Sequence, residues 1–391
     1  MMLFVICAGL LLLYAVLIIF YRKQWIKTPI SKLTPGEYGQ NISISVIIPA
    51  RNEGNNLPAL LQSLQAQTYA KHLFETIVIN DYSTDDTAAV VQQFPDVTLI
   101  NLADELGNLR INAYKKKAIE IAIARSTGNI IVTTDADGVV PPEWLSNIAT
   151  SFDQQPIQLL VMPVAMFDTT ASDGPFTKFL KIFQALDFMT LQGITGASVH
   201  AGFHSMCNGA NLAYTKHAFN TVDGFKDIDQ LASGDDMLLM HKINKQFTGQ
   251  IKYLKAKEVI VHTSPMSTLK DFLNQRIRWA SKADSYKDHR IVLVLVLVYL
   301  VNLVLLLIPV ISFFYRTPIF IHLKLIHIWC IFLFFKIAVE LYFLWPVAEF
   351  FNKKQLLWYF PVAQPFHIVY TVVAGFLGKF GTYKWKGRAV K

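Results

Sequence analysis

The sequence is poor in cysteine and in charge. Its three cysteines, Cys7, Cys207 and Cys330, lie far apart in the chain, which excludes a disulfide framework or a zinc site built on cysteine pairs. Charged residues make up 16% of the 391 positions, against about 25% in ordinary soluble proteins, and 53% are hydrophobic. This balance excludes a disordered chain or a coiled coil, and it disfavours a wholly soluble enzyme.

A concentrated basic segment is also absent, although the formal net charge is +8. The lysines and arginines are scattered, and short clusters of them flank apolar runs. An anionic membrane surface explains this distribution better than nucleic acid does, so we expect a membrane partner and no nucleic acid.

Long uncharged runs are present at both ends of the chain. Residues 2–20 carry no charge, and Arg22, Lys23 and Lys27 follow them where a signal peptide would have a small-residue cleavage site. The run is long enough to cross a bilayer, so we predict an uncleaved membrane anchor. The positive-inside rule then places the residues after this anchor in the cytoplasm.

Three further apolar segments follow a long polar stretch. Segment 291–314 is uncharged, segment 319–345 contains a lysine and a glutamate that can pair on one helix face, and segment 355–378 is interrupted by two prolines. We expect two to three of them to cross the membrane. Segment 355–378 is our candidate for an interfacial or re-entrant helix, because the basic tail 379–391 then stays on the cytoplasmic side.

Strand and helix patterns alternate in the central part of the chain. The predicted strands are 43–49, 75–80, 97–101 and 129–134, and the predicted helices include 56–67 and 115–125. Alternation at this spacing predicts an α/β fold with a doubly wound, mostly parallel sheet. Ligands of such sheets bind at the carboxyl ends of the strands.

Acidic residues follow two of these strands. The turn after the second strand begins Asn80-Asp81, where a carboxylate can accept from a nucleotide base or ribose, although turn and capping chemistry alone also favours Asp there. Asp135 and Asp137 leave the fourth strand together. Two such oxygen ligands suit Mg²⁺ or Mn²⁺, which would bridge them to a diphosphate.

Two more motifs lie further along the chain. Gly234 precedes the pair Asp235 and Asp236 at the start of an amphipathic helix, whose dipole by itself favours acids at that place. The segment 275–279 (QRIRW) lies shortly before an apolar run. It is either an interfacial belt or a set of guanidinium groups for a diphosphate, with an indole for a sugar ring.

The four motifs in this order resemble those of family 2 glycosyltransferases, the membrane-bound inverting enzymes with a GT-A fold, over roughly residues 42–290. The resemblance implies that the donor is bound by Asp81, Lys117, Asp135, Arg276 and Arg278. It implies that the acceptor is bound by Asn208, Gly209, Gln275 and Trp279.

The same resemblance implies a metal site and a catalytic base. Asp137, together with Asp135, would hold Mg²⁺ or Mn²⁺. Asp236 would be the base, and Asp235 is the alternative because the family's Glu-Asp pair is Asp-Asp here. The family's double-Asp turn begins with Asn80 in this chain, which leaves one carboxylate for the nucleoside.

The expected organisation is a GT-A domain with one N-terminal and two to three C-terminal transmembrane helices. Its parts are an anchor over 1–22, a cytosolic GT-A domain over 42–265, an interfacial helix with the QRIRW segment over 266–290, membrane segments over 291–378 and a basic tail over 379–391.

These features predict a multi-pass enzyme of the cell membrane with a cytoplasmic catalytic domain. It would transfer a sugar from a nucleoside diphosphate sugar, expected to be a UDP-sugar, to a lipid acceptor. A processive polysaccharide synthase acting on a growing glycan is the alternative, which we disfavour because few spans make a polymer tunnel difficult. A non-catalytic nucleotide-binding membrane protein is a second alternative, and the intact acidic series argues against it.

Overall fold

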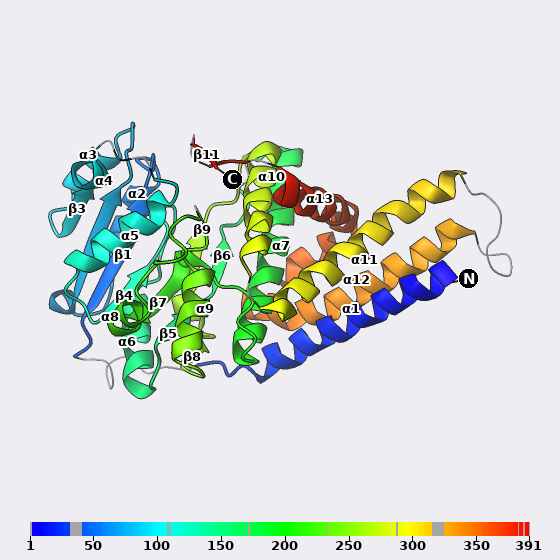
Figure 1. The fold of residues 1–391 in the computed structure, drawn as a ribbon, viewed down its shortest axis with the longest axis horizontal. Coiled ribbons are helices and arrows are strands. Elements are labelled where there is room, and N and C mark those ends of the chain that lie inside the picture. Colours follow the sequence, from blue (N-terminus) through cyan, green and yellow to red (C-terminus); the bar gives the residue numbers. More distant parts are fainter. Residues whose placement is uncertain are drawn as a thin grey trace.

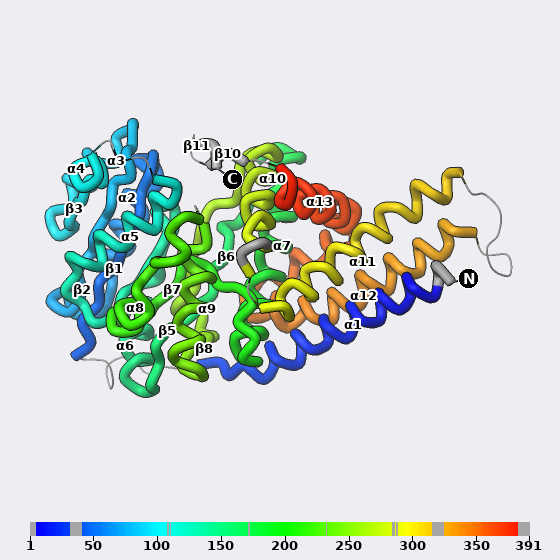
Figure 2. Tube along the Cα trace, in the orientation of Figure 1, coloured from blue at the N-terminus to red at the C-terminus, as the bar shows by residue number. Residues whose placement is uncertain are grey.

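The structure is a computed structural model in which a sheet domain and a helical bundle lie end to end (Figures 1 and 2). The residues that it describes are 2–31, 41–107, 109, 111–170, 173–231, 233–286, 288–314, 324–381, 383–385 and 388–390.

The main sheet has its strands in the order β3-β2-β1-β4-β7-β5-β8. Their bounds are β1 (Ile44–Ala50), β2 (Phe74–Asn80), β3 (Val97–Asn101), β4 (Ile130–Thr133), β5 (Leu159–Val161), β7 (Leu212–Thr215) and β8 (Ile251–Tyr253). The first four are parallel, whereas β7 runs antiparallel to both β4 and β5. The four strands predicted from the sequence are confirmed to within a single residue at each end.

Helices cover both faces of this sheet because its buried strands are apolar on both sides. Alternate residues of β1 enter two separate cores: Val46 and Ile48 pack with α2 and α6, and Ile47 packs with α5 and α9. The helices of the domain are α2 (Leu57–Gln65), α3 (Thr87–Gln92), α4 (Leu102–Leu106), α5 (Tyr114–Arg125), α6 (Trp144–Gln154), α8 (Lys216–Thr221) and α9 (Met237–Gln246). This arrangement is the predicted α/β architecture.

The helix α7 (Pro175–His200) lies between the sheet domain and the bundle (Figure 1). It packs against α1 and α12 of the bundle, and also against β8 and β6 (Val164–Met166), which pairs parallel with β9 (Val261–Thr263). Two glycines permit this close approach. A Cβ at Gly193 would lie 2.7 Å from the Val347 side chain, and a Cβ at Gly196 would lie 2.7 Å from that of Trp25.

Three long helices form the bundle: α1 (Met2–Lys27), α11 (His289–Phe314) and α12 (Leu325–Phe350). They extend away from the sheet domain together, with the N-terminus at the far end (Figure 1). Charge inside the bundle is paired, since Lys336 Nζ lies 2.8 Å from Glu340 Oε1 and donates to Gln364 Oε1 at 2.7 Å. The Tyr14 hydroxyl donates to the same glutamate.

Four helical segments of the described chain are long and apolar enough to cross a membrane, and the fourth combines η5 (Lys354–Tyr359) with α13 (Phe360–Phe380). This count agrees with one N-terminal and up to three C-terminal spans. Figure 2 shows α13 foreshortened beside α10 (Leu269–Ala280), across the long axis of the other three helices. The interfacial placement of segment 355–378 stays a prediction that this orientation favours.

The described part of the tail forms a hairpin against α10. Its two described strands, β10 (Tyr383–Trp385) and β11 (Arg388–Val390), pair antiparallel, and β10 lies against α10. Residues 382, 386–387 and 391 of the predicted basic tail lie outside the described residues. The described part of the tail is therefore beside α10.

Candidate active site

A cavity of about 680 Å³ lies at the carboxyl ends of β1, β2 and β4. It collects five aspartates from three of the sequence motifs, namely Asp81, Asp135, Asp137, Asp235 and Asp236. The cations among its lining residues are Arg51, Lys115, Arg278 and Lys282. Parallel strands end at one edge of a sheet, so residues distant in sequence meet there.

Asp81 follows β2 directly, and a hydrogen bond to its backbone carbonyl oxygen fixes its position. Its side chain is buried, and Arg51 Nη1 donates to the Asp81 carbonyl oxygen at 2.7 Å. The preceding Asn80 shapes the turn, because its Oδ1 accepts from the Ser83 N–H at 3.1 Å and its Nδ2 donates to Asn101 Oδ1 at 3.1 Å. The side-chain amide of Asn80 thus stabilises the turn, and Asp81 supplies the carboxylate that lines the cavity.

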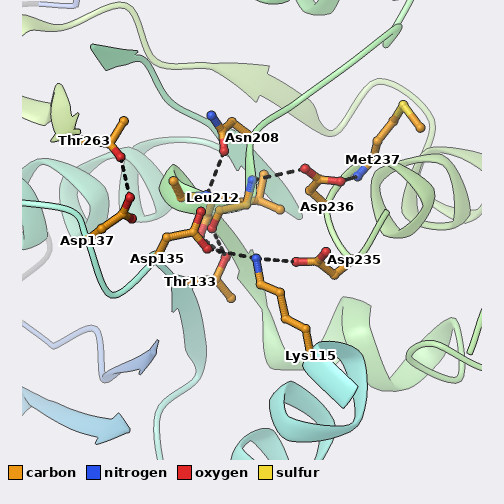
Figure 3. Close-up of polar contacts among 12 residues, drawn as sticks. Lys115, Thr133, Asp135, Asp137, Asn208, Leu212, Asp235, Asp236, Met237 and Thr263 are labelled. Carbon is orange, nitrogen blue, oxygen red and sulfur yellow. Dashed lines mark hydrogen bonds and ion pairs between the residues drawn. The ribbon is translucent and has the colours of Figure 1, made fainter. Parts of the chain in front are cut away.

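The ammonium group of Lys115 lies between aspartates of two different motifs. Its Nζ is 2.9 Å from Asp135 Oδ1 and 3.0 Å from Asp235 Oδ2 (Figure 3). Burial by itself would lower the pKa of Lys115, but the two carboxylates outweigh burial and raise this pKa above its ordinary value. Lys115 therefore stays protonated and connects the strand-end aspartates with the acidic pair.

Lys117, the lysine predicted to contact the nucleotide, is not among the residues that line the cavity. Its Nζ lies 3.4 Å from Glu120 Oε2. Helical periodicity explains this placement: Lys115 shares a face of α5 with the buried Ala118 and Ala122, whereas Lys117 does not. The prediction missed Lys115, and the same periodicity in the sequence was the signal that could have found it.

Asp135 and Asp137 leave β4 together and line the cavity. Asp137 Oδ2 accepts a hydrogen bond from the Thr263 hydroxyl at 3.0 Å (Figure 3). Among the described residues, no group of three or more His, Cys, Asp or Glu is placed to hold an ion by itself. Mg²⁺ commonly takes one or two carboxylates and completes its coordination with water and substrate phosphates. The two aspartates therefore fit an ion that shares its ligands with a diphosphate.

Asp235 is the member of the acidic pair that contacts Lys115. Gly234 before it has a φ of +84°, a backbone conformation that favours glycine. Burial raises the pKa of Asp235, but the ammonium groups of Lys115 and Lys282 outweigh burial and lower this pKa to about 2. The Asp235 carboxylate is therefore ionised and engaged by Lys115.

Asp236 occupies the N-cap of α9. Its Oδ1 accepts from the Met237 N–H at 2.7 Å, and its Oδ2 accepts from the Gly209 N–H at 3.3 Å (Figure 3). Lys282 Nζ lies 3.5 Å from Asp236 Oδ1. These contacts fix the direction of a carboxylate that still lines the cavity.

Asn208 and Gly209 line the cavity beside the acidic pair. Asn208 Oδ1 accepts from the Ala210 N–H at 3.0 Å and so fixes this turn. A Cβ at Gly209 would lie 3.2 Å from Asp235 Oδ2, which is tighter than ordinary packing. Burial raises the pKa of the neighbouring Cys207 thiol, so this thiol is a packing group rather than a nucleophile.

One face of the segment from α10 into η4 (Ser281–Ser285) forms a wall of the cavity. The residues of that face are Gln275, Arg278, Trp279 and Lys282. Their spacing of three and four is that of a single helix face. Lys282 was not among the predicted site residues. Its spacing of four from Arg278 and three from Trp279 was the sequence signal that could have found it.

Arg276, predicted to bind the donor, is not among the residues of that wall. Its guanidinium is buried, with Nη2 2.7 Å from Asp187 Oδ2 and Cζ 4.2 Å from the centre of the Trp279 ring. The helical position explains this placement, because Arg276 is displaced from the face that carries Gln275 and Arg278. Arg276 therefore connects α10 to α7 and supports the Trp279 ring from outside the cavity.

Comparison with known proteins gives matches to two family models. These are glycosyl transferase family 2, over residues 45–208, and glycosyl transferase family group 2, over residues 130–347. The second match covers more than half of the chain and runs from β4 through α10 and α11 into α12.

Two curated relatives match part of the chain. The chain is 30% identical over 112 residues to an undecaprenyl-phosphate 4-deoxy-4-formamido-L-arabinose transferase of Pseudomonas savastanoi, which covers 28% of this chain and 33% of the relative. It is 27% identical over 143 residues to the poly(ribitol-phosphate) beta-N-acetylglucosaminyltransferase TarS of Staphylococcus aureus, which covers 34% of this chain and 24% of the relative. The chain thus spans a third or less of the length of these relatives.

A solved structure has a similar fold over nearly the whole chain. It is the mannosyltransferase PcManGT from Pyrobaculum calidifontis in complex with GDP-Man and Mn²⁺. The TM-score is 0.52 at 17% identity, and the match covers 95% of each chain. This likeness shows the fold alone.

Proposed function

The chain belongs to the family 2 glycosyltransferases, and from this membership we propose that it moves a sugar from a UDP-sugar to a lipid acceptor, with inversion at the anomeric carbon. The observation that carries the proposal is the single cavity in which carboxylates and cations from four sequence motifs meet. A nucleoside diphosphate sugar combines two negative phosphates with a polar sugar, and the mixed lining suits both parts.

The donor would lie across the strand ends. Asp81, which lines the cavity where β2 ends, would accept from the nucleoside. Arg278 and Lys282 on the α10 wall would attract the diphosphate, since a guanidinium or ammonium group forms charge-assisted hydrogen bonds with phosphate oxygens. Asp137 and Asp135 would hold Mg²⁺ or Mn²⁺, which when bound would neutralise the negative charge of the leaving diphosphate.

Asp236 is the proposed base. Asp235 is engaged by Lys115 at 3.0 Å and its pKa is lowered to about 2, which makes it a weak proton acceptor near neutral pH. In the reaction, the acceptor oxygen bonds to the anomeric carbon on the face opposite the diphosphate. Its proton passes to the Asp236 carboxylate, the bond between the sugar and the diphosphate breaks, and UDP leaves.

A lipid acceptor is supported by where the cavity lies. Its α10 wall packs against α13, and α7 joins the sheet domain to the long apolar helices. One of the matched relatives is named as an undecaprenyl-phosphate sugar transferase. Buried side chains, among them Leu305, Phe332 and Phe343, pack in the core shared by α1, α11 and α12. This packing favours a single transfer over the extrusion of a polymer.

The sheet domain is proposed to face the cytoplasm at the cell membrane. Arg22, Lys23 and Lys27 lie at the end of α1 next to this domain (Figure 1). A positively charged end of a span is typical of its cytoplasmic side.

The test is a UDP-release assay on the purified full chain in lipid nanodiscs. A panel of UDP-sugars is offered with total bacterial lipid extract, and the lipid products are measured by mass spectrometry. UDP release together with one sugar added to a lipid supports the proposal, and Asp236→Asn is the control that should lose both. A polymeric product would indicate a synthase, and a folded chain that releases no UDP from any donor would contradict the proposal.

A further inference from the structure

A second cavity lies beside the active site and plays no part in the reaction described above. It has a volume of about 460 Å³ and lies between the N-terminal half of α7, the residues after β6, and η5. Its lining residues are mostly apolar or aromatic, namely Phe167, Ile182, Ala185, Leu356, Trp358 and Tyr359. Asp168, Lys178 and Lys181 are the charged residues of the lining.

The cavity opens at η5, where the fourth apolar segment begins. η5 connects α12 with α13, and it leaves Trp358 86% exposed and Tyr359 44% exposed. Large aromatic side chains exposed at the end of a membrane helix are typical of the boundary between lipid and water. An apolar cavity with this rim is therefore accessible to a lipid from the bilayer.

Contacts at the base of η5 fix the cavity wall. Lys353 Nζ donates to the Met166 carbonyl oxygen at 2.7 Å and lies 2.9 Å from Asp168 Oδ1. This lysine is itself buried, so the pair attaches the start of η5 to the end of β6. The cavity is consequently formed by connected elements of the fold.

The charges at the cavity favour an anionic lipid. Lys181 Nζ lies 2.6 Å from Asp173 Oδ1, and Asp168 is paired with Lys353. Among the described residues, Lys178 is thus the lining cation that no carboxylate neutralises, and its side chain is exposed. A phosphate-bearing headgroup would be attracted to this position.

The two cavities are separated by one layer of residues. Met166 lines the active site and the next residue, Phe167, lines the second cavity. On α7, Phe188 lines the first and Ala185, one turn earlier, lines the second. Leu356 of η5 packs on the same small apolar cluster as Trp279 of the active site.

We propose that this second cavity is the docking site of the lipid acceptor. Its occupant is an anionic lipid, whose hydrocarbon chain packs against the aromatic rim and whose headgroup approaches Lys178 before it reaches the neighbouring active site. This inference rests on the proposed function, because it assigns the place where that function's acceptor is held.

The kinetic test compares Trp358→Ala with the matched control Trp345→Ala, a tryptophan of α12 that is 58% exposed and does not line the cavity. Undecaprenyl phosphate is the long-chain acceptor and citronellyl phosphate the short-chain one. Trp358→Ala should raise the KM for the long-chain acceptor about tenfold, the effect of losing a large apolar contact, and leave the KM for the UDP-sugar unchanged. Equal KM values for Trp358→Ala and the control would overturn the inference.

A second variant tests the charge. Lys178→Glu should raise the KM for undecaprenyl phosphate, whereas Lys245→Glu, which changes an exposed lysine of α9, should not. Because both lysines are exposed, neither change should prevent folding. Identical KM values in these two variants would contradict the role of Lys178.

A binding measurement separates this inference from the proposed function. Undecaprenyl phosphate carrying a diazirine on its chain is photocrosslinked to the full chain in nanodiscs, and the labelled peptides are identified by mass spectrometry. The docking site is supported if η5 and the N-terminal half of α7 are labelled and if unlabelled undecaprenyl phosphate prevents this labelling. This conclusion holds even if no sugar is transferred. Sugar transfer to the lipid without competed labelling of these segments would refute the docking site and leave the proposed function intact.

Discussion

Arg276 Nη2 on α10 lies 2.7 Å from Asp187 Oδ2 on α7, and the two side chains are 4% and 5% exposed. The same carboxylate accepts a hydrogen bond from the Tyr370 hydroxyl of α13. One buried carboxylate therefore connects three helices where the sheet domain meets the bundle. Because α10 also carries Arg278 and Trp279 into the active site, this contact determines how the wall of the site is oriented.

Replacing one member of this pair should destabilise the protein. Arg276→Met leaves Asp187 as an unpaired buried carboxylate, and we expect it to lower the free energy of unfolding by about 3–5 kcal/mol. The double variant with Asp187→Leu should recover most of this loss, because it removes the uncompensated charge. Thermal unfolding of the wild type, the two single variants and the double variant measures the effect. Wild-type stability of Arg276→Met would show that the pair does not hold α10.

The two neighbouring aspartates should differ in their effect on turnover. Asp236→Asn keeps the shape of the side chain but removes the proton acceptor, so kcat should fall by about 10²–10⁴-fold while the UDP-sugar still binds. Asp235→Asn should act mainly on stability or donor binding, since Asp235 is paired with Lys115. Steady-state kinetics with binding of UDP as the control distinguishes the two. If Asp235→Asn loses turnover and Asp236→Asn does not, the base is Asp235 and not Asp236.

Activity should require a divalent ion. A departing diphosphate needs its charge neutralised, and Asp135 and Asp137 are the oxygen ligands that line the cavity at the end of β4. Excess chelator should abolish UDP release, and added Mn²⁺ or Mg²⁺ should restore it. Asp137→Ala should remain inactive whichever ion is added. Full turnover in chelator would exclude this role of the aspartates.

The pairing of Lys115 with Asp235 predicts a dependence of stability on pH. The pKa of Asp235 is lowered from 3.8 to about 2 on folding, so its stabilising effect is complete above pH 3.8 and is lost as the pH falls toward 2. Lys115→Met removes the larger of the two lysine effects that lower this pKa, and leaves the Asp235 carboxylate less stabilised at neutral pH. The difference in Tm between wild type and variant should therefore be largest near neutral pH and should narrow on acidification.

Lys117→Met is the matched control for this measurement, because Lys117 is half-exposed and pairs with Glu120 outside the cavity. Its Tm should follow that of the wild type at every pH. If the Lys115→Met difference stays constant down to pH 3, the coupling between Lys115 and the acidic motifs is smaller than the geometry indicates.

The tail should lie on the same side of the membrane as the sheet domain. In a chain without native cysteines, Ala389→Cys should be protected from an impermeant thiol reagent applied outside intact cells, because β10 of the same hairpin lies against α10. Phe314→Cys, at the far end of α11, is the control that should react. Labelling of Ala389→Cys from outside would place α13 across the membrane.

The sequence by itself determined the sheet and the position of most acidic groups. Largely apolar runs such as residues 44–50 form strands buried on both faces. Asp81, Asp135 and Asp137 meet because parallel strands end at one edge of the sheet. The long uncharged runs likewise predicted the apolar helices, since length and hydropathy are properties of a continuous segment.

Only the tertiary structure decided which neighbouring side chain of a motif reaches the cavity. Helical periodicity places Lys115 and Lys117 on different faces of α5, and Arg278 and Arg276 on different faces of α10. Periodicity alone does not show which of these faces lines the cavity. For α10 that choice depends on Asp187 and Tyr370, which lie on other helices far away in the chain. A contact between distant segments leaves no local pattern, because it is created by the packing of whole elements against one another.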